Sequence, residues 1–295
     1  MSLSREALFQ VDGVAASLVT CSAPTGPAGP VEVADSDAVV FPVEGRFEKH
    51  LNRSHHILAD PLTVVLFAEG RPHRVAHPAP GGDTCLSICL GSECLASLLA
   101  DAVGVEGLGD PRLHPGAPLP LGTVAARMLL LHRVRRGDAS PLECVTAAVA
   151  LVGAALIATR SVPLPTRPPP LDSRDRVVAA RDLLFEHPVE EWTLGRLEAS
   201  VGLSRFHLTR LFRAHVGISP YEYVLRVRLL RTAEEVIDTR RSLTEIALDY
   251  GFSSHSHFTA AFRRRVGVPP STLRPGKGAS WSTIMTALMP MGSLH

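Results

Sequence analysis

With 295 residues, the chain is longer than one typical folding domain, so we expect about two domains. Hydrophobic residues make up 45% and charged residues 20% of the sequence, a balance that excludes a chain disordered throughout. The net charge of +1 alone neither favours nor excludes a nucleic-acid partner.

The N-terminus and the cysteines predict a cytoplasmic protein. The first ten residues, MSLSREALFQ, contain no basic stretch followed by an apolar run and a cleavage site, so we expect no signal peptide. No apolar run reaches about 18 residues without a charge or a proline, and we expect the apolar stretch Ala147 to Ala158 to be a buried helix. The five cysteines are odd in number, which is typical of reduced thiols rather than of a disulfide framework.

The first hundred residues carry short runs of β-branched and apolar residues, separated by turns rich in proline and glycine. These runs predict four strands: Val14 to Thr20, Ala38 to Phe41, Thr63 to Phe67 and Thr84 to Leu90. Several short strands with such turns are typical of a small antiparallel barrel or sandwich.

Two helices and a linker are predicted to follow. The amphipathic stretches Leu121 to Arg136 and Pro141 to Arg160 are expected to be helices, which either build a dimer interface or fill out the first domain. Residues 161–172 contain five prolines and predict a semi-rigid linker. We therefore expect a sensor and dimerisation domain over 1–160, a DNA-binding domain over 173–276 and a disordered tail over 277–295.

After the linker the chain reads as helical throughout, and its charge changes sign. Met1 to Leu171 contains 13 basic and 16 acidic residues, whereas Asp172 to Gly278 contains 17 basic and 13 acidic residues. Nearly all of these basic residues are arginine, which suits phosphates and guanine edges. A first helix is predicted from Ser173 to about His187, and the hydroxyls of Thr193 and Ser204 are expected to cap the next two helices.

An internal repeat indicates DNA binding. The segment Thr193 to Pro220 matches Ser242 to Pro270 in apolar and glycine positions, with one residue inserted in the second copy. Each copy predicts a short helix, a glycine-containing turn and a second amphipathic helix, which is the helix-turn-helix plan. One long helix, from Ser219 to Thr239, is expected to join the copies and to place the two second helices about one DNA turn, roughly 34 Å, apart.

The second helix of each copy has two different faces. Its buried stripe is predicted to be Leu208, Leu211 and Phe212 in the first copy, and Phe258, Ala261 and Phe262 in the second. The opposite face of the first copy carries Arg205, Thr209, Arg210 and Arg213. A short polar face that bears arginine can enter a major groove and contact base edges and phosphates.

On these motifs, Ser173 to Arg274 resembles the DNA-binding domain of the AraC/XylS-type transcription regulators. The stretches SRFHLTRLFRAHVGISPYEYVLRVRLLRTAEEV and IALDYGFSSHSHFTAAFRRRVGVPPSTLRPG carry the resemblance, and the first 160 residues resemble more loosely the family's cupin-like sensor, around VVFPVEGRF and HPAPGGD. The resemblance implies DNA contact by Arg205, Phe206, Thr209, Arg210, Arg213, His255, Ser256, Thr259 and Arg263. Phe206 has an alternative role as a core residue, and Thr209 as ordinary surface.

Three residues depart from the family's pattern. Ala260 stands where the family has arginine, which predicts weaker DNA contact by the second unit. Glu198 replaces a small alanine and puts its packing against the recognition helix in doubt, and Leu273 replaces a closing tyrosine.

A second hypothesis is a metal- or thiol-sensing regulator. His50, His55 and His56 are clustered, His73 and His77 lie four residues apart, and Cys85, Cys89 and Cys94 follow. Imidazoles and thiolates are ligands that zinc and copper prefer, but the spacing matches no known pattern, and Cys85 and Cys89 on one strand would lie about 13 Å apart. A third hypothesis, a cupin-type enzyme, depends only on HLNRSHH, residues 50–56.

These observations together predict a two-domain α+β protein. We expect a cupin-like antiparallel β-barrel with helices, followed by an all-α tandem helix-turn-helix domain. The predicted function is a transcription regulator, more often an activator than a repressor. Its expected partners are double-stranded promoter DNA, RNA polymerase, a second copy of the chain and a small-molecule effector, with no membrane. We assign no catalytic residue, no cofactor and no metal ligand from the sequence.

Overall fold

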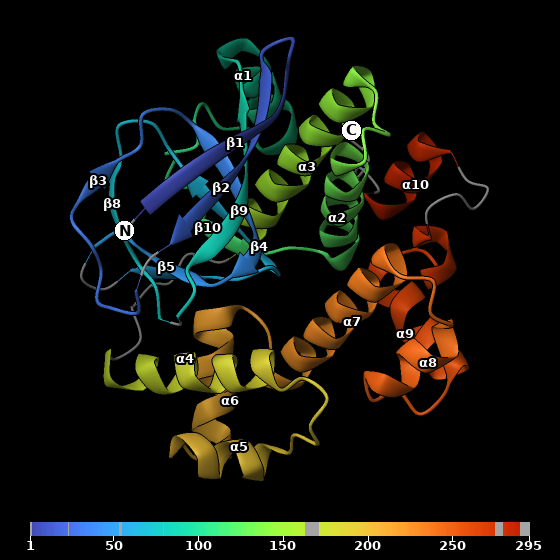
Figure 1. The fold of residues 1–295 in the computed structure, drawn as a ribbon. Helices are drawn as coiled ribbons and strands as arrows, with labels where there is room; N and C mark the ends of the chain where they lie inside the picture. The colour runs from blue at the N-terminus through green and yellow to red at the C-terminus, as the bar shows by residue number, and fades with distance from the viewer. Residues whose placement is uncertain are drawn as a thin grey trace. The chain divides into compact units, whose positions relative to one another are not determined.

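The computed structural model describes residues 2–22, 24–52, 55–78, 80–162, 171–274 and 280–289 (Figure 1). Residue contacts divide the chain into two compact units. Unit 1 takes its residues from 1–119, 133–164 and 289–295, and unit 2 from 120–132 and 165–288. Most of the predicted linker, residues 163–170, lies outside the described part.

Unit 1 is built on two antiparallel sheets. The six-stranded sheet has the order β1-β2-β9-β4-β7-β10, and the four-stranded sheet has the order β3-β8-β5-β6. The strands are β1 (Ser2–Val11), β2 (Val14–Ser22), β3 (Glu32–Val33), β4 (Ala38–Gly45), β5 (Phe47–His50), β6 (His56–Ala59), β7 (Thr63–Phe67), β8 (Pro72–Ala76), β9 (Asp83–Leu90) and β10 (Gly116–Pro118).

The four predicted strands are confirmed as β2, β4, β7 and β9, but the closed barrel is not. Among the described residues, β1 and β10 are the two edges of the larger sheet and do not pair with each other, so the sheet stays open. The remaining strands lack the apolar runs that the prediction requires. Most of β1 is exposed, and β5 contains the charged pair Glu48 and Lys49.

The interior of unit 1 is apolar with one lysine inside it. Phe47, Ile57, Ala59, Val65 and Cys85 form a buried cluster. Lys49 is 3% exposed, its Nζ donates to the Leu66 carbonyl at 2.5 Å, and the same atom lies 3.8 Å from the centre of the Phe67 ring. Burial lowers the pKa of Lys49 to about 8.

Three helices accompany the sheets: α1 (Ser92–Val103), α2 (Leu121–Arg135) and α3 (Pro141–Ser161). Ser140 and Glu143 form a capping box that fixes the start of α3, and Pro141 occupies its first position. By length and hydropathy alone α3 could cross a membrane, but 50% of its most apolar stretch is buried in the fold, so this is weak evidence for a span. Both predicted helices are thus present.

Unit 2 is helical. Its helices are α4 (Leu171–Glu186), α5 (Leu194–Val201), α6 (Arg205–Val216), α7 (Pro220–Asp238), α8 (Leu243–Asp249), α9 (His255–Val266), the 3-10 turn η1 (Pro270–Leu273) and α10 (Trp281–Leu288). The sequence predicts a disordered tail after residue 276, and α10 corrects this. The buried side chains of Met285 and Leu288 give that helix an apolar face, which holds it in the fold.

Candidate nucleic-acid interface

The first helix-turn-helix unit consists of α5 and α6. Gly202 lies between them in the left-handed conformation, with φ of +67°, which allows the sharp turn. Leu208, Leu211 and Phe212 of α6 are buried as predicted. The Thr193 hydroxyl accepts from the Arg196 amide at 3.1 Å and caps α5, which confirms that prediction.

The second unit, α8 and α9, repeats this arrangement. Ser242 and Glu245 form a capping box on α8, and the Ser254 hydroxyl accepts from the His257 amide at 3.1 Å at the start of α9. Phe258, Ala261 and Phe262 are buried, in positions equivalent to Leu208, Leu211 and Phe212. The predicted duplication is therefore present in three dimensions, with one difference. Ser204 occupies the capping position of α6, but its hydroxyl makes no capping bond.

The face of α6 opposite its buried stripe carries the predicted DNA-contact residues. Arg205, Phe206, Arg210 and Arg213 are exposed, and Thr209 is half-buried, with its hydroxyl donating to the Arg205 carbonyl at 2.8 Å. Phe206 is 83% exposed, which rules out the alternative that it belongs to the core. An aromatic ring so exposed on a polar helix face requires another explanation.

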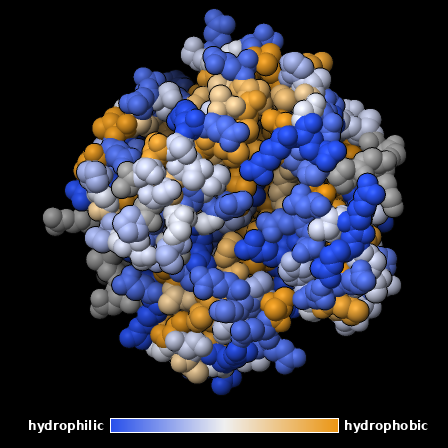
Figure 2. Space-filling model, in the orientation of Figure 1, coloured by the Kyte–Doolittle hydropathy of each residue, from blue (hydrophilic) through white to orange (hydrophobic). Residues whose placement is uncertain are grey.

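The outer face of α9 borders a shallow, open groove. Ser256, Thr259, Ala260, Arg263, Arg264 and Gly267 line it. Three of the four predicted contact residues of this helix are thus brought together. The fourth, His255, is exposed at the start of the helix, and its Nε2 lies 3.4 Å from the Thr259 hydroxyl. Figure 2 shows hydrophilic side chains predominating on the visible face where Figure 1 shows α7 and α9.

Arg264 is a groove residue that sequence reasoning missed. Arg263, Arg264 and Arg265 are consecutive in the last turn of α9, and the run itself was the available signal. Arg263 and Arg264 are exposed and make no ion pair with any described residue. Arg265 is different, because its guanidinium bonds the Glu222 carboxylate of α7 at 3.1 Å.

Glu222 connects the second recognition helix to the long helix α7. It also pairs with Arg226, at 3.3 Å. Burial alone would raise the pKa of Glu222, but the hydrogen bonds from Arg265 and Arg226 outweigh it, so the pKa of this carboxyl is lowered. The ionised form therefore joins α7 to α9 at neutral pH.

Other arginines of unit 2 bond the backbone of the fold and are not presented to solvent partners. The Arg176 guanidinium of α4 donates to the Gly202 carbonyl at 2.6 Å, in the turn of the first unit. Arg228 of α7 donates to the carbonyls of Pro188 at 2.6 Å and Glu190 at 3.1 Å, ahead of α5. The basic excess predicted to face DNA is therefore divided between a structural frame and the recognition helices.

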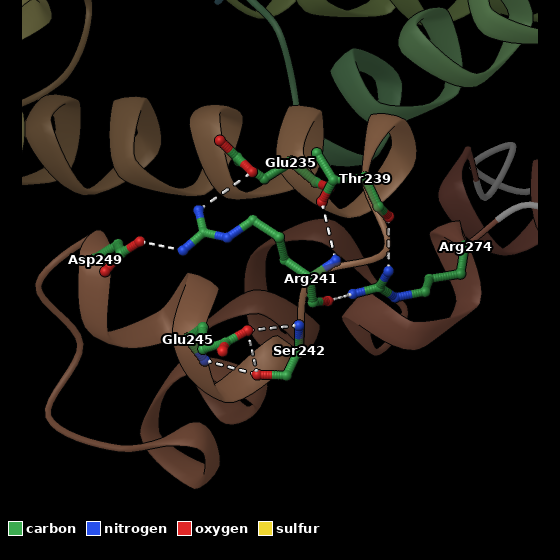
Figure 3. A network of polar contacts seen from close by, with 7 residues as sticks. All are labelled: Glu235, Thr239, Arg241, Ser242, Glu245, Asp249 and Arg274. Carbon is green, nitrogen blue, oxygen red and sulfur yellow. Dashed lines mark hydrogen bonds and ion pairs between the residues drawn. The ribbon is translucent and has the colours of Figure 1, made fainter.

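A network of polar contacts joins α7 to the second unit (Figure 3). The Arg241 side chain reaches Glu235 of α7 on one side, at 3.5 Å, and Asp249 of α8 on the other. Arg274, after η1, donates to the Thr239 carbonyl at 2.7 Å and to the Arg241 carbonyl. The end of α7, the start of α8 and the end of η1 are thus held together.

The three departures from the family pattern have clear places. The Glu198 carboxylate accepts from Arg205 Nε at 2.9 Å, so it bonds the recognition helix rather than disturbing it. Leu273 is fully buried in η1. Ala260 lies exposed in the α9 groove, at the position equivalent to Arg210.

The histidines and cysteines of the metal-sensor hypothesis are spread over unit 1. His50 and His56 lie on paired strands with ring centres 4.2 Å apart, edge to face, and His55 bonds Asn52 at 3.1 Å. Cys85 and Cys89 are both on β9, whereas Cys94 is on α1. Among the described residues, a different set, Cys21, His77 and Asp83, has its ligand atoms within 4.8 Å of one another.

Comparison with known proteins follows this division. Residues 197–275 match the family described as a helix-turn-helix domain. The chain is 36% identical over 95 residues to the HTH-type transcriptional regulator MtrA of Neisseria gonorrhoeae, covering 32% of each chain. It is 36% identical over 101 residues to an AraC-like transcription regulator of Streptomyces lividans, covering 34% of this chain and 33% of the relative.

Solved structures are similar over the same part. A transcriptional regulator with an AraC-type DNA-binding domain from Chromobacterium violaceum is 29% identical, with a TM-score of 0.33, and the match covers 37% of this chain and all of that one, 100%. The chain spans about a third of the length of the two curated relatives.

Proposed function

The C-terminal part of this chain is a helix-turn-helix domain of the AraC type, and we propose that it binds double-stranded promoter DNA with α6 and α9 in the major groove. The observation that carries the proposal is the pair of equivalent helices, each with a buried apolar stripe and an exposed polar face. Arg205, Phe206, Thr209, Arg210 and Arg213 are the proposed contacts of α6.

In the second unit, the proposed contacts are His255, Ser256, Thr259 and Arg263, to which we add Arg264. Helix α7 has 19 residues, so it spans about 28 Å and keeps the two units apart. The polar network at its end and the ion pair of Glu222 with Arg265 support a fixed angle between them. Such a frame suits a DNA site read in two successive major-groove segments.

The proposed role of the whole chain is a cytoplasmic transcription regulator, with unit 1 as the part that senses an effector and dimerises. Leu142 and Ile157 of α3 are exposed, at 75% and 41%, which supports an apolar contact with a second copy. Activation through RNA polymerase is the proposed outcome of DNA binding.

Selection of bound genomic fragments by the purified full chain, followed by fluorescence anisotropy on the enriched sites, tests the proposal. Four arginines on phosphates would make log K fall with log salt at a slope of about −3.6. Arg5→Ala, an exposed arginine in β1, is the matched control and should bind as the unmodified chain does. A folded protein without salt-dependent affinity for any duplex overturns the proposal.

A further inference from the structure

The ends of β2, β8 and β9 bring three metal-binding side chains together inside unit 1. Cys21 lies near the end of β2, His77 follows β8 and Asp83 begins β9. Their sulfur, nitrogen and oxygen ligand atoms all lie within 4.8 Å of one another. His77 Nε2 and Asp83 Oδ1 are 2.7 Å apart, and the Cys85 thiol donates to Asp83 Oδ2 at 3.1 Å.

The backbone holds this cluster in place. Cys21 is directly opposite Asp83 in the pairing of β2 with β9, so the two side chains project from the same face of the sheet. The backbone of His77 forms an isolated bridge with Gly26. Gly82, at φ of +74°, passes so close to β2 that an added Cβ would lie 1.8 Å from the Cys21 carbonyl oxygen. The cluster therefore sits on rigid elements, as a binding site requires.

The chemistry of the three side chains selects the kind of ion. Cys21 and His77 are buried, at 6% and 3% exposed, and the Asp83 side chain is 8% exposed. Thiolate, imidazole and carboxylate together are zinc ligands, whereas calcium and magnesium require oxygen ligands. Ligands on a tetrahedral zinc ion lie roughly 3.3–3.8 Å apart, so small side-chain rotations would close the present separations around an ion.

We propose that Cys21, His77 and Asp83 form a three-ligand zinc site in unit 1, with a fourth coordination position open to water or a small anion. On binding, the Cys21 thiol loses its proton to solvent and its sulfur bonds the ion. Neutral His77 donates the lone pair of Nε2, and Asp83 exchanges its hydrogen bond to His77 for a bond to the metal. Cys85 acts as a positioning residue, because its thiol orients the Asp83 carboxylate.

This site is distinct from the cysteines and histidines that the sequence suggested, and it does not depend on DNA binding. Only His77 belongs to both sets. The ligands come from segments about 60 residues apart in the chain, so their spacing resembles no motif. Zinc binding is measured on the full chain without DNA, so its failure and a failure of DNA binding are separate results.

The test uses the full chain, stripped with a chelator and then incubated with zinc chloride. We expect one zinc ion per chain after desalting, and a thiolate-to-cobalt charge-transfer absorption when cobalt replaces zinc. Cys21→Ser and His77→Gln should weaken zinc binding at least about tenfold, a conservative figure because outer-shell changes alone cost 10–100-fold. Cys89→Ser and Cys94→Ser, matched controls outside the cluster, should retain full occupancy.

Two results overturn the proposal. One is an unmodified chain that binds no stoichiometric zinc and shows no thiolate absorption with cobalt, in which case His77 and Asp83 form only a buried hydrogen bond. The other is zinc occupancy that is lost in Cys89→Ser or Cys94→Ser but kept in Cys21→Ser. If Cys21→Ser does not fold, the cobalt spectrum and the zinc-induced rise in melting temperature of the unmodified chain still decide.

Discussion

Glu198 of α5 and Arg205 of α6 form an ion pair, with Oε2 and Nε 2.9 Å apart, at the start of the first proposed recognition helix. The carboxylate competes with a DNA phosphate for the same guanidinium. We expect Glu198→Gln to tighten binding to non-specific duplex by up to about fivefold, because exposed ion pairs contribute ~0.2–1 kcal/mol. The salt dependence of anisotropy titrations should also become steeper, and unchanged affinity at low salt would show that Arg205 does not contact DNA.

The equivalent positions Arg210 and Ala260 allow a reciprocal test of the two units. Arg210→Ala should weaken binding to a selected site by ~1–3 kcal/mol, which is about 5–150-fold. Ala260→Arg should strengthen binding, since it adds a cation to the α9 groove. Both are measured by anisotropy at physiological salt against Arg5→Ala, and equal affinities in all three variants would remove both positions from the interface.

Phe206 separates a DNA contact from a folding role. Because its ring is 83% exposed, Phe206→Ala should change the free energy of unfolding by less than about 0.5 kcal/mol. Its affinity for a selected site should nevertheless fall, since the ring would lose its contact with the groove. Chemical denaturation and anisotropy on the same preparation check the two halves, and a large loss of stability with normal affinity would contradict this assignment.

The network around Arg241 predicts a difference between whole and half sites. Arg241→Ala removes the contacts to Glu235 and Asp249 that join α7 to α8 (Figure 3). We expect weaker binding to a duplex that spans both recognition helices, and unchanged binding to a duplex that holds only the first half. Titrations of the two lengths measure this, with Arg240→Ala as the neighbouring control; parallel losses on both duplexes would argue against a spacing role.

Lys49 predicts a pH dependence of stability in unit 1. Its folded-state pKa of about 8 lies below the ordinary value of 10.5, so between these values the folded protein binds fewer protons than the unfolded chain. The free energy of unfolding should therefore rise with pH from about 8 to 10.5, by at most about 3 kcal/mol relative to Lys49→Met. Denaturant unfolding of both proteins at several pH values measures the difference. Parallel pH profiles would show that Lys49 is uncharged or solvated.

Much of unit 2 could be predicted from the sequence because its signals are local. Leu208, Phe212, Phe258 and Phe262 recur at helical spacing, and the glycines mark each turn, so the repeat is visible without long-range information. The absence of a Ser204 cap and the division of arginines into frame and surface depend on side-chain directions that no spacing reveals.

Unit 1 was less predictable because its sheets depend on contacts distant in sequence. The strand β9 pairs with β2 and β4, and whether the edges β1 and β10 meet is decided by strand tilt and register, which one sequence does not encode locally. For the same reason Cys21 was counted but not connected with His77 and Asp83. Helix α10 was missed because the stretch after residue 276 carries few charges and no clear start signal.

The inequality of the two recognition helices gives the DNA-binding domain a polarity. Where α6 presents Arg205, Phe206 and Arg210, α9 presents His255, Ser256 and Ala260 in the equivalent positions. A single domain would thus read a non-palindromic sequence, and turning that sequence end for end would pair each helix with the wrong bases. The orientation of a site relative to the start of transcription would then decide which side of the protein meets the polymerase.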